Sequence, residues 1–174
     1  MRVLFVCLGN ICRSPTALAA TREALVAAGL DDRMELDSAG TGDWHVGNPP
    51  DERMRRAGRD VGLEIDGAAR QVLAGELERW DLVLAMDRRN LAALRAMAPA
   101  RLHDRIRLFL EFLPDDAARP PAGAEPGLGP DEVPDPYYGG AAGFAGVVAL
   151  CRAAASGLVD ELAAALDGGG RVRR

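Results

Sequence analysis

RVLFVCLGNICRSP, from Arg2 to Pro15, is the stretch of sequence that determines the architecture. Its apolar run, Val3 to Cys7, is too short for a helix and fits a strand buried on both faces, as in a parallel sheet. A loop of small residues follows. Ser14-Pro15 then marks a helix start, because proline is tolerated in the first turn. Ligands of open α/β sheets bind beyond the strand C-termini, where a helix N-terminus offers free N–H groups. A phosphate-sized anion site is therefore predicted between Cys7 and Ser14.

The spacing of Cys7 and Arg13 predicts the chemistry of this loop. A thiol attacks at neutral pH as its thiolate, and a helix N-terminus with a nearby cation lowers a thiol pKa from about 8.5 to about 3.5–7.5. Five residues separate Cys7 from Arg13, so the loop can curl with its N–H groups inward while the guanidinium binds two oxygens of one phosphate. A lone cysteine is most often a small buried hydrophobe. The Cys-x5-Arg-Ser spacing favours a sulfur nucleophile instead.

The stretch CLGNICRSP resembles the signature loop of the low-molecular-weight protein-tyrosine phosphatases. Further blocks similar to that family follow in the same order: Asp37-Ser38-Ala39-Gly40-Thr41, Trp44-His45-Val46-Gly47, Ala69-Arg70-Gln71, Asp81 to Asp87 with Asn90-Leu91, and Asp135-Pro136-Tyr137-Tyr138-Gly139. The resemblance implies an α/β fold, a single-domain three-layer sandwich with a four-stranded parallel sheet flanked by helices. It also implies hydrolysis of phosphotyrosine monoesters through a phosphocysteine.

By the same resemblance, the walls of a substrate pocket can be assigned. The phosphate is expected to be bound by the loop, that is by Leu8, Gly9, Asn10, Ile11, Cys12 and Ser14. The Ser14 hydroxyl is expected to donate to the thiolate, and Ser38 to support Asn10 from beneath. Trp44 would form one wall for a flat phosphoaryl group, or else anchor its loop on the core. Tyr137 and Tyr138 would flank the opening.

Asp135 is the candidate general acid. Pro136 fixes its own φ and pushes Asp135 towards an extended conformation, which aims one carboxyl group. A positioned acid that protonates the leaving oxygen is typically worth about 10²–10⁴ in rate. We predict that Cys7 attacks phosphorus while Arg13 holds the equatorial oxygens, and that Asp135 later activates the water that hydrolyses the phosphocysteine. No metal and no other cofactor is expected, because Arg13 and backbone dipoles supply the positive charge.

Gly67 is a departure from the family pattern. Many relatives carry a histidine here, two residues before the Ala69-Arg70-Gln71 block, where it helps to hold the loop asparagine. Either Asn10 is held by Ser38 and other groups, or the loop is looser than usual. We interpret Arg70 as a solvated arginine rather than an orienting one. Asp87 follows a strand and is explained as a helix cap with at most an indirect role in the site.

The rest of the chain alternates strands and helices, which predicts right-handed crossovers and a parallel sheet. Helices are expected over 14–28, 50–61, 88–97 and 143–166, and strands over 34–37, 81–86 and 106–110, with 38–50 as a loop. Residues 114–134, rich in Pro, Gly, Ala and Asp, are predicted to form an exposed, mobile segment. One domain over 1–167 and a flexible basic tail over 168–174 are expected.

Length, composition and net charge limit the kinds of protein that this chain can be. A chain of 174 residues with 48% hydrophobic residues suits one domain with a core. A net charge of −5 argues against nucleic acid as the main partner. No signal peptide or membrane span is recognised, so a cytoplasmic protein is expected, a monomer or weak homodimer that acts on phosphotyrosine-containing proteins. The odd set of Cys7, Cys12 and Cys151 suits a reducing compartment, with Cys151 expected in the core.

Three other functions share the loop. Arsenate reductases relay a disulfide through cysteines near mid-chain, and residues 81–97 contain none. Protein-arginine phosphatases typically have a smaller polar residue in place of Ile11. A non-catalytic phosphate-binding or redox-sensing module is the third, supported by Cys12, five residues from Cys7 on one curled loop. We therefore predict that peroxide reversibly inactivates the protein by pairing these two cysteines.

Overall fold

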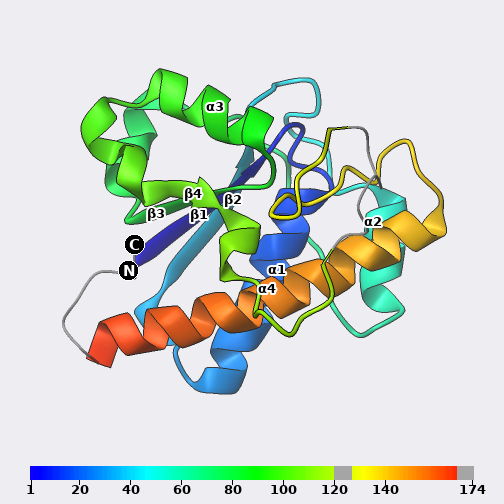
Figure 1. Cartoon of the computed structure of the whole chain (residues 1–174). Helices are drawn as coiled ribbons and strands as arrows, with labels where there is room; N and C mark the ends of the chain where they lie inside the picture. The colour runs from blue at the N-terminus through cyan, green and yellow to red at the C-terminus, as the bar shows by residue number, and fades with distance from the viewer. Residues whose placement is uncertain (120–126, 168–174) are drawn as a thin grey trace.

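The computed structural model describes residues 1–119 and 127–167. Its sheet contains four parallel strands in the order β2-β1-β3-β4, as expected (Figure 1). These strands are β1 Arg2–Cys7, β2 Glu35–Gly40, β3 Leu82–Ala85 and β4 Ile106–Leu108. The two central strands, β1 and β3, are almost wholly apolar because both of their faces are covered.

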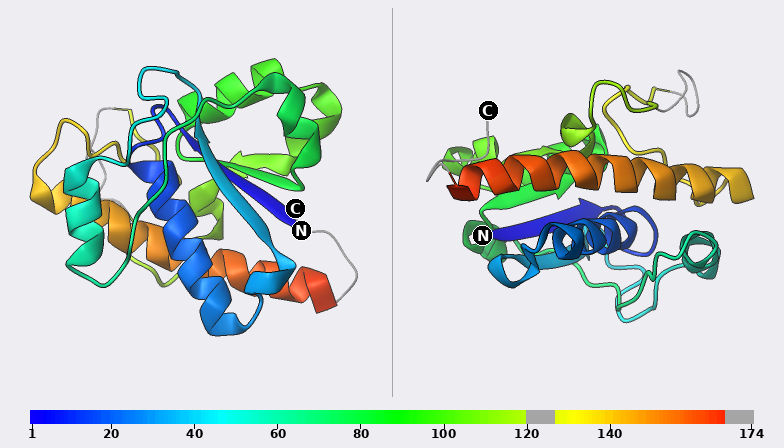
Figure 2. Two further views of the ribbon diagram at one scale, coloured as in Figure 1. Left: turned by 180° about the vertical axis from the view of Figure 1, so that it is seen from behind. Right: turned by 90° about the horizontal axis from the view of Figure 1, so that it is seen from below.

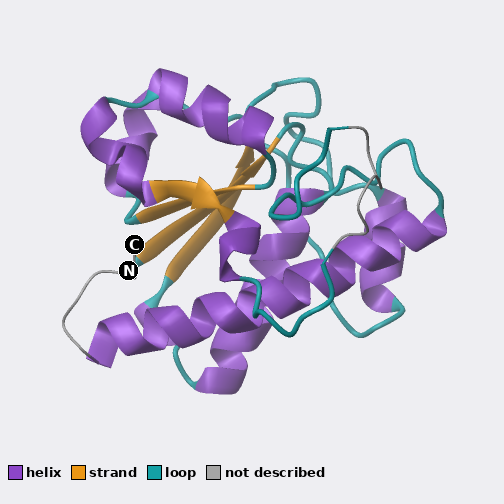
Figure 3. Ribbon diagram, viewed as in Figure 1, coloured by secondary structure: helices purple, strands orange, loops and turns teal. Residues whose placement is uncertain are grey.

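Helices cover both faces of this sheet, which confirms the three-layer prediction (Figures 1 and 3). They are α1 Arg13–Ala28, α2 Glu52–Arg59, α3 Arg88–Met97 and α4 Ala141–Asp167. Side chains alternate across β1, so Val3 and Phe5 pack in the core shared with α1 and α4. Leu4 and Val6 point the other way, towards Leu94 of α3. All four of these side chains are fully buried.

The long helix α4 lies across α1 and beside α2 (Figure 2). It has a mean hydropathy of 1.7 and, by length and composition alone, could cross a membrane. Half of its apolar stretch is buried against the rest of the chain, as in the core helix of a globular domain. Cys151 lies on this buried face and is fully inaccessible, as predicted.

Two glycines of α4 are expected to respond oppositely to substitution. A Cβ on Gly157 would overlap the Phe112 carbonyl oxygen, whereas Gly146 has open space around it. Gly157→Ala should therefore lower the free energy of unfolding by about 1–3 kcal/mol, the cost of overpacking. Gly146→Ala should raise it by about 0.5–1 kcal/mol, because alanine loses less backbone entropy in a helix. Urea denaturation of both variants measures the difference, and equal effects would place the glycines in similar packing.

Several expected boundaries are wrong. The second strand continues to Gly40, which pairs with Cys7 and bridges to Gln71, so the following loop is shorter than 38–50. The fourth strand stops at Leu108, because Glu111 accepts from the Leu108 N–H and starts a 3-10 helix, Phe109–Phe112. The second helix covers only Glu52–Arg59. Three more 3-10 helices, not predicted, lie at Asp31–Arg33, Ala74–Arg79 and Ala100–Arg105.

The segment 114–134 is not exposed throughout, contrary to the prediction. Val133 is fully buried, and its N–H donates to the Met86 carbonyl at 2.7 Å. Glu132, 5% exposed, accepts from the Arg88 N–H at the start of α3 at 2.7 Å. The end of this segment is thus docked on the junction of β3 and α3. Residues 120–126 of the segment and the predicted tail, 168–174, lie outside the described residues.

Candidate active site

The loop between β1 and α1 builds the site at the C-terminal end of the sheet, as predicted. Its conformation depends on Asn10, the one described non-glycine residue with positive φ, at +55°. Asparagine tolerates this left-handed region better than most residues. The turn aims the Asn10 N–H at the Cys7 sulfur, 3.2 Å away, while the Ser14 hydroxyl lies 3.0 Å from the same sulfur. Cys7 is therefore held from two sides at the base of the loop.

A pocket of about 330 Å³ opens above Cys7. Of the predicted residues, those that line it are Cys7, Leu8, Gly9, Ile11, Cys12, Arg13, Trp44, Asp135, Tyr137 and Tyr138. Asn10 and Ser14, predicted to bind substrate, instead lie behind the loop, with 2% and 0% exposure. Their side chains can reach substrate only through Cys7 and the loop backbone.

Arg13 is the charge centre of the site. Its guanidinium is 4% exposed and forms ion pairs with Asp87 at 2.6 Å and with Asp135 at 2.7 Å. Burial by itself would lower the pKa of this guanidinium, but the negative charges of Cys7, Asp135 and Asp87 outweigh it and raise the pKa. Arg13 therefore remains a cation, and each carboxylate occupies a different nitrogen of its fork.

Asp87 and Asp135 are placed by their own local turns. Asp87 is the N-cap of α3 and accepts from the Asn90 N–H at 2.6 Å, so the predicted cap is confirmed. Its second oxygen holds Arg13, which gives it the predicted indirect role. Asp135 accepts from the Tyr137 N–H at 3.2 Å, two residues on, across Pro136.

Aromatic side chains surround the opening of the pocket. Trp44 is 70% exposed, so the alternative that it anchors its loop on the core is wrong. Tyr138 is 96% exposed and meets Tyr137 edge to face at 5.1 Å. His45 also lines the pocket and lies against Gly9, a role that the sequence analysis missed although the chain has only two histidines. These rings give the pocket an aromatic entrance.

Arg53 is a second residue that sequence reasoning missed. It donates to the Tyr137 carbonyl at 3.0 Å, and its guanidinium lies 5.1 Å from the centre of the Tyr137 ring. This arginine of α2 therefore supports one side of the entrance. No local motif marks it, because its partner lies 84 residues away in the sequence.

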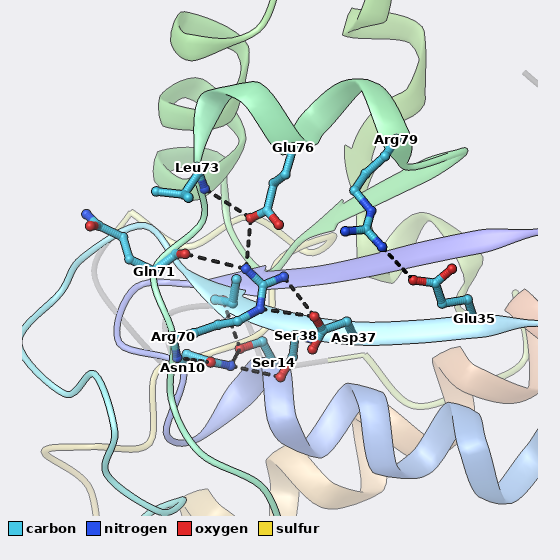
Figure 4. A network of polar contacts seen from close by, with 11 residues as sticks. Asn10, Ser14, Glu35, Asp37, Ser38, Arg70, Gln71, Leu73, Glu76 and Arg79 are labelled. Atoms are coloured by element: carbon cyan, nitrogen blue, oxygen red, sulfur yellow. Dashed lines mark hydrogen bonds and ion pairs between the residues drawn. The ribbon is translucent and has the colours of Figure 1, made fainter.

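The side chain of Asn10 is held firmly despite Gly67. Its Nδ2 donates to Ser38 and to Ser14, each at 2.9 Å, and its Oδ1 accepts from the Arg70 N–H at 2.9 Å (Figure 4). The first alternative from the sequence, in which Ser38 and other groups hold Asn10, is confirmed. The interpretation of Arg70 as solvated is wrong, because its guanidinium pairs with Asp37 and Glu76.

The other two cysteines are buried thiols. Burial, with the nearby charge of Asp51, raises the pKa of the Cys12 thiol well above its usual value, and burial raises that of Cys151. All three cysteines are unpaired. The proposed oxidative pairing of Cys7 with Cys12 stays a prediction.

Alkylation is therefore expected to be selective. Iodoacetamide at neutral pH should modify Cys7 and spare the other two cysteines. Cys12 also lines the pocket, but its raised pKa keeps the thiol protonated. Cys151 is both protonated and fully buried. Mass spectrometry of peptides after partial reaction measures this, with saturating inorganic phosphate as the protecting control. Modification of Cys12 at a comparable rate would contradict the assignment.

Comparisons with known proteins agree with this geometry. The family model described as "Low molecular weight phosphotyrosine protein phosphatase" matches residues 2–167. A low molecular weight protein-tyrosine-phosphatase of Streptomyces coelicolor is 42% identical over 168 residues, which cover 96% of each chain. A crystal structure of a protein tyrosine phosphatase from Entamoeba histolytica, with Hepes in its active site, superposes with a TM-score of 0.85 at 34% identity, over 95% of this chain and 99% of that one.

Proposed function

Because the chain belongs to the low molecular weight phosphotyrosine protein phosphatase family and hydrolyses phosphotyrosine through a cysteine, we propose how its residues divide the reaction among them. The single observation that supports the division best is the meeting of Cys7, Arg13 and Asp135 around one pocket. A nucleophile, an anion-binding fork and an acid are the three groups that cysteine-based phosphoryl transfer requires.

In the first step the Cys7 thiolate attacks phosphorus in line. A sulfur–phosphorus bond forms and the bond from phosphorus to the phenolic oxygen breaks. The Asp135 carboxyl gives its proton to that oxygen, so tyrosine leaves neutral. Arg13 and the inward N–H groups of the loop hold the three equatorial oxygens as charge spreads over them.

In the second step water attacks the phosphocysteine. The Asp135 carboxylate accepts a proton from this water, the sulfur–phosphorus bond breaks, and inorganic phosphate forms. The Ser14 hydroxyl, 3.0 Å from the sulfur, stabilises the departing thiolate by donating a hydrogen bond. The cycle returns Cys7 and Asp135 to their starting protonation states.

The ion pairs of Arg13 suggest how substrate binding brings Asp135 into position to act as the general acid. In the described structure Asp135 occupies one nitrogen of the guanidinium at 2.7 Å. An incoming phosphate needs that nitrogen, so it displaces the Asp135 carboxylate towards the leaving oxygen. There, beside the negative charge of the phosphate and away from Arg13, the carboxylate takes up from solvent the proton that it gives in the first step. Asp87 stays on the other nitrogen at 2.6 Å and keeps the fork aligned throughout.

We further propose that the enzyme acts on phosphoproteins in the cytoplasm. We also propose that it is a monomer or weak homodimer and that it needs no metal or cofactor. The aromatic side chains of Trp44, Tyr137 and Tyr138 at the entrance suit an aryl phosphate. Three unpaired cysteines suit a reducing compartment.

Hydrolysis of a phosphotyrosine peptide in the presence of EDTA tests the function directly. We expect phosphate release that EDTA leaves unchanged, with little release from phosphoserine and phosphoarginine peptides. Faster hydrolysis of the phosphoarginine peptide would favour the arginine phosphatase. A parent protein that binds phosphate without hydrolysing any of the three peptides would favour the binding module.

A further inference from the structure

A chain of hydrogen bonds leads from the backbone of Arg70 to the sulfur of Cys7. The Arg70 N–H donates to Asn10 Oδ1 at 2.9 Å, Asn10 Nδ2 lies 2.9 Å from Ser14 Oγ, and Ser14 Oγ lies 3.0 Å from Cys7 Sγ. Figure 4 shows the first two of these contacts side by side, between β2 and α1. Asn10 and Ser14 are buried and inaccessible to substrate, so the chain approaches the sulfur from behind.

In this series of hydrogen bonds, the backbone N–H of Arg70 determines which groups donate and which accept. A serine hydroxyl can donate or accept, so Ser14 and Ser38 alone would fit either orientation of the Asn10 amide. A backbone N–H only donates, and the Arg70 N–H faces one end of the amide. It therefore requires the oxygen of the amide at that end and places Nδ2 against both serines.

This orientation determines what Ser14 does. Because the Ser14 oxygen accepts from Asn10 Nδ2, its own hydrogen is available for another partner. The Cys7 sulfur at 3.0 Å is close for a contact to sulfur, and the alternative acceptor, the Ala39 carbonyl, is farther away at 3.3 Å. If the amide were reversed, its oxygen would compete with the sulfur for the hydrogen of Ser14.

The guanidinium of Arg70 holds the residue's own backbone in place. It binds Asp37 of β2 through two nitrogens, at 3.0 and 2.9 Å, and Glu76 at 2.8 Å. Glu76 also accepts from the Leu73 N–H at 3.0 Å, which ties the next turn to the same group. The Arg70 carbonyl accepts from the Gly40 N–H at 2.8 Å. The two ion pairs and this backbone hydrogen bond thus hold Arg70 against the edge of the sheet.

We infer that Arg70 is a positioning residue for phosphoryl transfer: its N–H orients the Asn10 amide so that Ser14 donates to the Cys7 sulfur, and its ion pairs keep that N–H in register. The inference rests on the proposed function, which it extends to a residue outside the pocket. Gly67 has no side chain that could hold Asn10 from behind the loop. The Arg70 N–H is therefore the donor that fixes the orientation of the Asn10 amide.

The test compares Arg70→Ala with Arg79→Ala. Arg79 is a matched control because it also forms an ion pair to β2, with Glu35 at 2.9 Å, but has no contact with Asn10 (Figure 4). The rate of Cys7 alkylation by iodoacetamide is followed against pH by mass spectrometry. In Arg70→Ala the profile should move to higher pH by about half a unit to one unit, because the thiolate loses a donor. Arg79→Ala should match the parent.

Kinetics and a double variant separate positioning from stability. We expect Arg70→Ala to lower kcat for a phosphotyrosine peptide several-fold, with a smaller change in KM. Arg70→Lys should recover only part of the lost kcat, because one ammonium cannot bridge two carboxylates.

In an Asn10→Ala background, Arg70→Ala should add no further shift of the alkylation profile. If Arg70→Ala does not fold, Glu76→Gln provides the same test with a smaller shift.

Three results would overturn the inference: an alkylation profile of Arg70→Ala that coincides with the parent, an equal shift in Arg79→Ala, or additive shifts in the double variant. Alkylation needs no turnover. The alkylation rate therefore tests the role of Arg70 even if the protein does not hydrolyse the peptide. A failure of the proposed function is seen separately, as a parent enzyme without activity.

Discussion

Cys7→Ser is expected to reduce phosphotyrosine hydrolysis by at least about 10⁴-fold, the scale on which loss of a nucleophile acts in an otherwise intact site. A serine hydroxyl stays protonated at neutral pH, and no nearby histidine is within the hydrogen-bonding set of Cys7 to activate it. Single-turnover release of tyrosine from a phosphopeptide is the direct measurement. A phosphorylated serine that accumulates and then hydrolyses would contradict this expectation.

Phosphate binding by the same variant should survive, because Arg13 and the loop N–H groups remain. Titration calorimetry with inorganic phosphate distinguishes loss of chemistry from loss of the site. Cys151→Ala is the control for removing a thiol, since this side chain is fully buried in α4 and should leave kcat unchanged. Loss of phosphate binding in Cys7→Ser would mean that the loop itself had collapsed.

Asp135→Asn is expected to lower kcat for a phosphotyrosine peptide by about 10²–10⁴-fold, the usual contribution of a positioned acid. The loss should be much smaller for a nitrophenyl phosphate, because a weakly basic phenolate leaves without a proton. Brønsted plots of kcat over a series of aryl phosphates measure this. Equal losses for all leaving groups would show that Asp135 is not the proton donor.

The same variant should bind inorganic phosphate more tightly. Asp135 competes with phosphate for one nitrogen of Arg13, and an asparagine removes the competing charge. Arg13 is buried, but the Asp135 side chain is 29% exposed and solvent screens the pair. We therefore expect the pair to be worth about 1 kcal/mol, so the inhibition constant of phosphate should fall by about three- to fivefold. Asp131→Asn is the matched control, because Asp131 pairs with Arg88 outside the pocket. A similar change in the control would point to net charge alone.

The catalytic loop could be predicted from the sequence because it is encoded locally. A short apolar strand, a loop and Ser14-Pro15 specify the turn and the helix start within one continuous stretch, so Cys7 and Arg13 were placed correctly. Asp87 could be predicted as a cap for the same reason. Its ion pair with Arg13 could not, because 74 residues separate the two.

The contacts of side chains and segments whose partners lie far away in the sequence could not be predicted. Arg70 carries no local sign of its pairing with Asp37, 33 residues earlier. The Pro- and Gly-rich composition before Asp135 correctly suggests a loop but gives no indication that Val133 bonds to Met86. A segment's composition reports its local flexibility, whereas its burial depends on contacts that form only in the folded chain.

The contact between Arg13 and Asp135 also bears on how activity is acquired during folding. It joins residues 122 positions apart, and Asp135 enters its place just before α4, which packs across α1. Closing so long a loop is costly in chain entropy and slow compared with forming local helices. During refolding from urea, catalytic competence should therefore return later than helical circular dichroism. A nascent or truncated chain that lacks α4 would carry the entire nucleophilic loop and still be inert.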